Sequence, residues 1–488
     1  MPLSRLLAAL LCLAASLFAA DDLDSQLKSI IDTYSALEQN AADPVSSEQV
    51  FYQGAIPGLL RKLDPHSIFF DPGQFEQLRK LETSTQKGFG TVVSLLPGRV
   101  IVLQTLPGTP SAKAGLAPGD EILAINGYEI ARLDTEQLQQ LLGEARQHQA
   151  ELFVRRPGTS RIERFVMTPA DLQTPPVDRA FFVAAGIGYI RVGSFEESTA
   201  RQIREAIDKL GGAHLKGLVL DLRNNPGGLV AAAVDTASLF LKPGLPIVTV
   251  RGRNVPEHTE TVSKIAEPYE FKLAILVNEK TASASEILTG AMQDHDRATV
   301  LGVPTYGKGL VQSVFPLTEG TGLALTTALY YTPSGRSIQK PLDAAQFGLA
   351  GTTARTNGAQ KFHTDQGRTV TGGGGIQPDI VVYPEAMNRL RVALEASGSF
   401  PGYATEYLSQ HKITPDFEVT PEILDQFHAW LSERAIQPGV AEWSVERDFV
   451  QSRLKTEIFN QALGVEKGDE VEAQRDPVIQ KALEVLGG

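Results

Sequence analysis

Apolar residues recur at helical spacing in the first eighty positions of the chain. The positions that share this spacing are Leu23, Leu27, Ile30 and Ile31, followed by Ile56, Leu59, Leu60 and Leu63. A period near 3.6 residues places such side chains on one face of a helix. Residues 21–82 are therefore predicted to be mostly helical, with turns at the Asp-Pro pairs of residues 64–65 and 71–72.

Between residues 83 and 170 the pattern changes to short runs of β-branched and large apolar residues. The runs occupy residues 91–93, 100–103, 121–125 and 152–154, and turns rich in Gly, Pro and Asn-Gly separate them. Such runs predict strands, and the spacing of apolar residues in 134–144 predicts one amphipathic helix. The segment has the size of one small β domain.

After a polar linker at residues 171–180, predicted strands and helices alternate. Strands are predicted at residues 188–192, 217–222 and 273–277, and helices at residues 200–210, 229–241 and 283–293. The run 217–222 is almost wholly apolar, as expected of a strand buried on both faces. This alternation predicts an α/β layer within residues 171–385. Residues 341–375 are predicted to be a loop, and residues 386–488 a charged helical region.

The first twenty residues have the features of a signal peptide. Arg5 is positive, residues 6–18 are apolar, and Ala19 and Ala20 suit a cleavage site. The apolar run is short for a membrane span. We therefore expect an exported protein, periplasmic or secreted, with an uncleaved membrane anchor as the alternative. Cys12 is the only cysteine, so the mature chain would have no disulfide and no thiol nucleophile.

Charge and composition argue against several other classes of protein. The formal net charge is -12, whereas nucleic-acid binding needs a basic surface, so no nucleic-acid partner is expected. The histidines are scattered and no pair has ligand spacing, so no metal is expected. The chain has no G-x-S-x-G elbow. The glycine run 372–375 lacks the lysine and helix of a phosphate-binding loop.

A serine at the end of a buried strand is the first candidate for chemistry. Ser283 follows the predicted strand 273–277 in a turn of small residues and precedes a predicted helix. A helix N-terminus offers free N–H donors and a positive partial charge, which would stabilise an oxyanion. Serine is also a common helix N-cap, and these residues alone favour that simpler role.

The second candidate is Lys308, which lies between Gly307 and Gly309. Glycines let other backbone approach closely. A lysine desolvated near Ser283 would have a lowered pKa, and its neutral amine would accept the serine proton. Gln312, four residues further on, would orient that amine. The simpler alternative is an exposed turn lysine.

The third candidate is the turn at residues 221–228, with the sequence DLRNNPGG, at the end of a predicted buried strand. The N–H groups of Gly227 and Gly228 are expected to supply a second oxyanion donor. A plain strand-to-helix turn is the alternative.

In this order and spacing, the three segments resemble the carboxyl-terminal processing peptidases, or tail-specific proteases, which are serine peptidases of the S41 type. The family nucleophile is the central serine of an S/T-A-S-A-S-E-I run, which falls on Ser283. The family base is the lysine of a T-F/Y-G-K-G run, which falls on Lys308, 25 residues later. The family glutamine, four residues beyond, falls on Gln312. Residues 291–302 and 331–339 also resemble the family.

The resemblance extends upstream to residue 50. Lys87-Gly88-Phe89-Gly90 is similar to the carboxylate-binding loop of a PDZ domain, and residues 111–127 follow the PDZ pattern. Such a loop binds a terminal carboxylate, and the bound tail adds as a strand. Gly88, Phe89 and Gly90 are therefore expected to bind the substrate tail. A generic small β domain is the alternative.

The resemblance implies an α/β fold: a crotonase-like or ClpP-like core with an inserted PDZ-like β domain and helical N- and C-terminal regions. It implies acyl transfer by Ser283 and Lys308, with oxyanion donors at Ala284 and at Gly227 or its neighbour Gly228, and no cofactor. The expected partners are the C-terminal tails of protein substrates. Activation by an adaptor protein or by PDZ movement, and a homodimer or larger oligomer, stay open.

Two other functions stay open. The chain would be a catalytically silent protein that only holds C-terminal tails, or an adaptor built on its terminal helices. Ser283, Lys308 and Gln312 together argue against the first, because a retired site has no chemical reason to keep all three. A triad of Ser283 with His295 and Asp294 or Asp296 is disfavoured, because the predicted helix carries those residues away from the serine.

Overall fold

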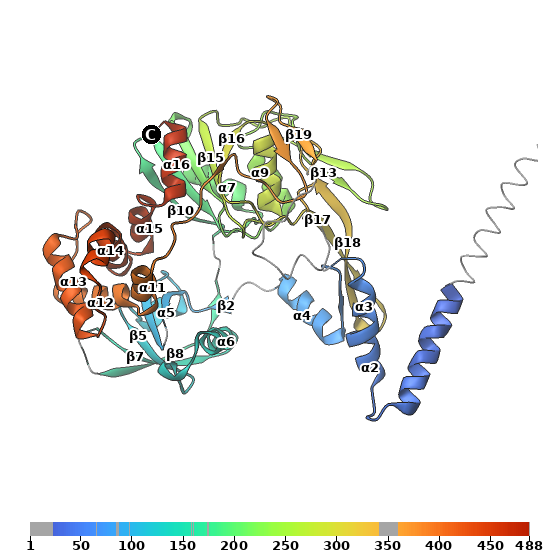
Figure 1. Cartoon of the computed structure of the whole chain (residues 1–488), viewed down its shortest axis with the longest axis horizontal. Coiled ribbons are helices and arrows are strands. Elements are labelled where there is room, and N and C mark those ends of the chain that lie inside the picture. The colour runs from blue at the N-terminus through green and yellow to red at the C-terminus, as the bar shows by residue number, and fades with distance from the viewer. Residues whose placement is uncertain are drawn as a thin grey trace, which may run out of the picture. The chain divides into compact units, whose positions relative to one another are not determined.

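The computed structural model describes residues 23–64, 66–83, 87–96, 98–157, 159, 161–172, 175–340 and 360–487. The expected signal peptide at residues 1–20, with Cys12, lies outside the described residues. Two compact units are present (Figure 1). Among the described residues, the first comprises those within 23–80 and 312–326, and the second those within 81–311, 327–340 and 360–487. No described helix is both long and apolar enough to cross a membrane.

The first unit combines helices with a short antiparallel sheet. A helix covers residues 23–40. The helices that follow are α2 (Ser47–Val50), the π-helix η1 (Phe51–Ala55), α3 (Ile56–Leu60) and α4 (Pro72–Thr83). Strand β1 (Ile68–Phe70) pairs with the first residues of β18 (Gly322–Tyr331). This strand was not predicted, because three residues between two Asp-Pro turns carry no periodic signal.

In the second unit, residues 87–171 form a β domain with its own core. The sheet order is β3-β4-β5-β7-β8, with β6 paired to β5. Its strands are β3 (Thr91–Leu96), β4 (Arg99–Thr105), β5 (Glu121–Ile125), β6 (Tyr128–Glu129), β7 (Ala150–Arg155) and β8 (Ile162–Met167). The predicted amphipathic helix is α6 (Thr135–Ala145), whose capping box at Asp134 fixes its start. A short helix α5 (Pro110–Ala114) and the strand pair β2 (Lys87–Gly88) and β9 (Ala170–Asp171) complete the domain.

A six-stranded sheet forms the centre of the second unit, in the order β10-β11-β12-β15-β16-β21. β10 is antiparallel to β11 and the other neighbours are parallel. The strands are β10 (Val177–Ala184), β11 (Ile187–Val192), β12 (Gly217–Asp221), β15 (Lys272–Val277), β16 (Ala298–Gly302) and β21 (Ile380–Val381). This confirms the predicted α/β layer.

Both faces of the central sheet are buried, by different helices. Leu218 and Leu220 point into one core with α7 (Thr199–Lys209), α8 (Val230–Ala237) and α9 (Ala284–Asp294). Val219, between them, points into a second core with α16 (Pro477–Leu486), the last helix of the chain. β12 is almost wholly apolar because both of its faces are buried.

Helix α8 is shorter than the predicted helix over residues 229–241. Its regular turns end at Ala237, and the N–H groups of Leu239 and Phe240 bond three residues back in tighter turns. Residues 239–241 are nevertheless buried in the core, so their apolar character reflects burial in a turn.

Further strands and helices complete the second unit. β13 (Pro246–Arg251) pairs with β14 (His258–Thr261) and with the last residues of β18. β19 (Lys361–His363) and β20 (Thr369–Thr371) form a hairpin within the segment predicted to be a loop. The C-terminal region is helical as predicted, with α11 (Arg389–Ala396), α12 (Ser399–Gln410), α13 (Pro421–Glu433), α14 (Val440–Ala462), α15 (Val465–Ala473) and α16. Its first helices share one apolar core.

Candidate active site

Ser283 occupies a strained turn between β15 and α9. Its φ of 57° and ψ of −118° lie in a region that residues with a side chain rarely adopt. The side chain is half-buried and stands at the first turn of α9. Backbone strain of this kind gathers at functional sites and is stabilised by the surrounding structure.

Gly227 brings the turn after β12 against this serine. A Cβ atom on Gly227 would lie 2.8 Å from the Cβ of Ser283 and 2.8 Å from the carbonyl oxygen of Ala282. Its φ of 103° also favours glycine. Position 227 therefore requires glycine both for its backbone conformation and because no space is left for a side chain. The turn 221–228 and the Ser283 turn, predicted separately, are brought together.

Asn225 fixes the position of this turn from inside the core. Its buried side chain donates to the carbonyl oxygen of Val192 at 2.8 Å and accepts the N–H of Gly227 at 2.9 Å. Its own carbonyl oxygen accepts the N–H of Ala282 at 3.0 Å. The Gly227 amide is thus already engaged. Within the described ranges, the N–H of Gly228 has no hydrogen-bond partner.

The Ala284 amide is the other free donor beside the serine. It opens α9, and within residues 175–340 it donates to no protein group. Two unpaired N–H groups, on Ala284 and Gly228, therefore flank the turn of Ser283. Free donors at a helix N-terminus suit an anion.

Glu286 connects the serine turn with the lysine segment. Its buried carboxylate accepts the N–H groups of Ser283 and Lys308 on Oε2, each at 2.9 Å. On Oε1 it accepts the N–H of Gly307 at 2.7 Å and the hydroxyl of Thr305 at 2.5 Å. Burial raises the pKa of the Glu286 carboxyl, and these hydrogen bonds act in the opposite sense.

Glu286 is the glutamate of the serine motif, and no role was predicted for it from the sequence. A signal was available, because S-x-x-E at the start of a helix is the pattern of a capping box. That pattern predicts the contact with the Ser283 N–H. It does not predict the three donors from residues 305–308, which arrive from another part of the chain.

Lys308 is half-buried between two glycines that other segments contact closely. The carbonyl oxygen of Gly307 accepts the N–H of Lys340 at 3.1 Å. The N–H of Gly309 donates to the side chain of Gln339 at 2.9 Å. A Cβ on Gly309 would lie 2.7 Å from the Ile338 side chain, which shows why glycine is required. Among the described residues, the Lys308 ammonium forms no hydrogen bond or ion pair.

Gln312 belongs to the first unit. It lies in β17 (Leu310–Pro316), and its side-chain amide donates to the carbonyl oxygen of His66 at 2.7 Å. Ser283 and Lys308 belong to the second unit. The expected role of Gln312 in orienting the amine stays a prediction.

The expected tail-binding loop opens the first strand of the β domain. Gly88 ends β2, Phe89 packs against the domain core, and Gly90 adopts a φ of 75°. A Cβ on Gly90 would lie 2.3 Å from the side chain of Thr109. β3 begins at Thr91 and, in the described part of the chain, pairs on one side with β4 only. An edge strand with one open side can accept an added strand.

In the described part of the chain, no group of three or more His, Cys, Asp or Glu is arranged so that it could hold a metal ion.

Comparison with known proteins matches two family models to this chain. Peptidase family S41 matches residues 186–345, and a PDZ domain matches residues 101–156. The first segment contains Ser283 and Lys308, and the second contains β5, β6, β7 and most of β4 of the six-stranded β domain.

Similar curated proteins carry processing-protease names. A carboxy-terminal-processing protease of Bartonella bacilliformis is 38% identical over 307 residues, which cover 60% of this chain and 68% of that protein. A carboxyl-terminal-processing protease of Synechocystis is 33% identical over 309 residues, covering 62% and 72%. Among solved structures, the photosystem II D1 C-terminal processing protease matches with a TM-score of 0.43 and 27% identity, covering 72% of this chain and 89% of that one.

Proposed function

Since this chain belongs to the carboxyl-terminal processing proteases, serine peptidases of family S41, we propose that Ser283 is its nucleophile and Lys308 its general base. The observation that carries this proposal is the shared carboxylate of Glu286. The backbone nitrogens of Ser283 and Lys308 each lie 2.9 Å from Oε2 of Glu286, so the two nitrogens are no further apart than twice that distance. Side chains on backbones this close can meet.

The reaction is an acyl transfer in two steps. The neutral Lys308 amine takes the proton of the Ser283 hydroxyl, and the serine oxygen attacks the scissile carbonyl carbon. The N–H groups of Ala284 and Gly228 hold the oxyanion, since both are free of protein partners in the described ranges. The lysine returns its proton to the leaving amine. Water, deprotonated by the same lysine, then attacks the acyl-enzyme. The bond from the carbonyl carbon to the Ser283 oxygen breaks, the lysine returns its proton to that oxygen, and the acid leaves.

Lysine must lose its proton before it can act as a base. Lys308 is half-buried, and in the described part its ammonium has no hydrogen-bond or ion-pair partner. Gln312 is proposed to orient the amine.

We also propose that the β domain binds the substrate's C-terminal tail. Gly88, Phe89 and Gly90 would receive the terminal carboxylate on backbone N–H groups, and the tail would extend along the open edge of β3. Tail binding delivers the adjoining chain to Ser283. Export through the predicted signal peptide, assembly into an oligomer and activation by an adaptor protein belong to the same proposal and rest on the sequence.

The experiment is cleavage of an unfolded reporter that ends in an apolar tail, by wild type and by Ser283→Ala. We expect wild type to cut near the tail and Ser283→Ala to bind the tail without cutting. Equal cutting by both would assign the nucleophile elsewhere. Binding of the tail by both without cutting would favour a silent tail-binding protein.

A further inference from the structure

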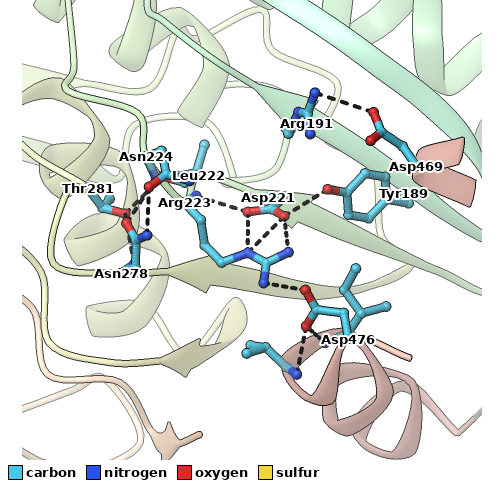
Figure 2. A network of polar contacts seen from close by, with 12 residues as sticks. Tyr189, Arg191, Asp221, Leu222, Arg223, Asn224, Asn278, Thr281, Asp469 and Asp476 are labelled. Carbon is cyan, nitrogen blue, oxygen red and sulfur yellow. Dashed lines mark hydrogen bonds and ion pairs between the residues drawn. The ribbon is translucent and has the colours of Figure 1, made fainter. Parts of the chain in front are cut away.

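The last helix of the chain contacts the turn after β12 through a single carboxylate (Figure 2). Asp476 caps α16: its Oδ1 accepts the N–H of Val478 at 2.8 Å and of Ile479 at 3.1 Å. Its Oδ2 accepts Nη1 of Arg223 at 2.6 Å. The helix cap and the ion pair therefore use different oxygens of one side chain.

Arg223 is the second residue after β12, in the turn that carries Gly228. Its guanidinium donates to Asp221 through Nε at 3.0 Å and Nη2 at 2.6 Å, and the Tyr189 hydroxyl donates to the same carboxylate at 2.8 Å. Burial alone would lower the pKa of the Arg223 guanidinium, but Asp221 and Asp476 raise it above its ordinary value. The arginine thus stays charged between two carboxylates. Asp221 is the last residue of β12, and Asp476 is the N-cap of the last helix.

Apolar packing and charged groups meet at this junction. The first turn of α16 packs into the second core of the sheet, and a cavity of about 380 Å³ beside the network has Arg223, Asp469 and Asp476 in its lining together with apolar residues. On α15, Asp469 forms a parallel link, since it pairs with Arg191 at 3.5 Å and with Arg179. Charged hydrogen bonds, which are strong and directional, therefore add a specific tie between the helix start and the turn.

The turn has three anchors along its length. Asn225 fixes the glycine end. The backbone N–H of Asn224 donates to Oδ1 of Asn278 at 2.9 Å, and Nδ2 of Asn278 donates to Oδ1 of Asn224 at 3.0 Å. Arg223 fixes the start. The partners of Asn224 and Asn225 come from the peptidase segment, residues 186–345. Asp476 comes from a helix 253 residues away.

We propose that Asp476 is a positioning residue for catalysis: through Arg223 it holds the turn that presents the Gly228 N–H to the oxyanion. This inference rests on the proposed function. With Asp476 removed, Nη1 of Arg223 loses its partner and Asp221 alone holds the guanidinium, so the start of the turn loses its tie to the last helix. An error near 1 Å in a catalytic group costs about 100-fold in rate. The last helix would then be part of the active-site scaffold.

The test is Asp476→Asn in the full chain. Asparagine caps helices as well as aspartate does, so the variant keeps the cap and removes the charge. We expect kcat and the rate of Ser283 phosphonylation by a fluorophosphonate to fall about 10- to 100-fold, with KM within about twofold. The KM-against-kcat split separates positioning from substrate binding. Unchanged kcat and phosphonylation would overturn the proposal.

Two variants of the same helix serve as controls. Glu484→Gln removes an exposed ion pair with Lys481 and should leave kcat unchanged. Leu486→Ala weakens the packing of α16 on the sheet without touching Asp476. If Leu486→Ala lowers stability as much as Asp476→Asn and lowers kcat equally, general loosening explains the loss and the proposal is wrong.

A double variant keeps the test decisive if Asp476→Asn is unstable. Arg223→Gln and Arg223→Gln with Asp476→Asn should have the same kcat, because Asp476 would act only through Arg223. A further loss in the double variant would contradict the proposal. Failure of the proposed function has a different signature, since wild type would then cut no better than Ser283→Ala.

Discussion

The backbone N–H groups of Ser283 and Lys308 donate to one oxygen of Glu286, each over 2.9 Å. The proposed nucleophile and the proposed base are thus held by their main chains, and neither side chain is used in these hydrogen bonds. Since the carboxylate is buried, each of these hydrogen bonds is costly to lose.

Glu286→Gln should therefore reduce activity far more than its small change in shape suggests. The new NH₂ group would face N–H donors, and each unsatisfied buried donor costs about 1–3 kcal/mol. We expect kcat to fall by about 100-fold, measured with the tailed reporter. Glu205→Gln removes an exposed carboxylate that pairs with Arg201 on α7 and should keep full activity. A Glu286→Gln enzyme with wild-type kcat would show that the shared oxygen has no role.

The same carboxyl should give stability a measurable pH dependence. Burial raises the Glu286 pKa in the folded protein, so the folded state favours the protonated form. The contribution of this carboxyl to the free energy of unfolding is fully present below its unfolded pKa of about 4.3. That contribution is lost as the pH rises through the raised pKa of the folded state. The Tm of wild type minus the Tm of Glu286→Gln should therefore decrease as the pH rises from about 4. A difference that moves in favour of wild type would mean that the four hydrogen bonds outweigh burial.

Gly227→Ala should abolish cleavage. Its Cβ would lie 2.8 Å from that of Ser283, so the serine turn must move. Gly244→Ala is the matched control, because Gly244 has a φ of 82° but open space around its Cβ position. Gly244→Ala should lose about 1 kcal/mol of stability to left-handed strain, measured by urea unfolding, and Gly227→Ala should lose more because the clash adds to the strain. Only Gly227→Ala should lose activity, and equal activity in the two variants would contradict the close approach.

Gly90→Ala should weaken tail binding without changing the chemistry. A Cβ there would lie 2.3 Å from Thr109, so the loop must deform. We expect the Kd for an apolar tail peptide to rise by about tenfold or more, corresponding to about 1.4 kcal/mol. Gly127→Ala has similar strain (φ 82°) and no contact within 4 Å, and it should bind the peptide normally. Normal binding by Gly90→Ala would place the tail elsewhere.

The buried pair of Arg336 and Asp294 should be essential for stability. Arg336 is fully buried and donates to Asp294 at 2.8 Å, and Asp294 also accepts the N–H of Ser334 at 2.9 Å. Arg336→Met would leave a buried carboxylate unpaired and should cost about 3–5 kcal/mol, measured by urea unfolding. Arg201→Met breaks an exposed pair and should cost less than about 1 kcal/mol. A small loss in Arg336→Met would mean that Asp294 is satisfied by its other donors.

Several features of this protein were determined by the sequence itself, because their causes are local. The alternation of buried strands and helices follows from apolar periodicity, and the N-terminus of α6 follows from its capping residues. The resemblance to the family rests on short motifs, among them those of Ser283 and Lys308. Each of these signals is contained within a few dozen consecutive residues, so no knowledge of the chain path is needed.

The tertiary structure alone decided how distant segments share partners. Glu286 collects donors from its own helix start and from residues 305–308. β1 became a strand because β18 pairs with it, and α16 became part of the central core because it covers the second face of the sheet. Asp476 meets Arg223 across 253 residues. Hydrogen bonds and packing of this kind depend on where the folded chain returns, and residue type and spacing carry no record of that path.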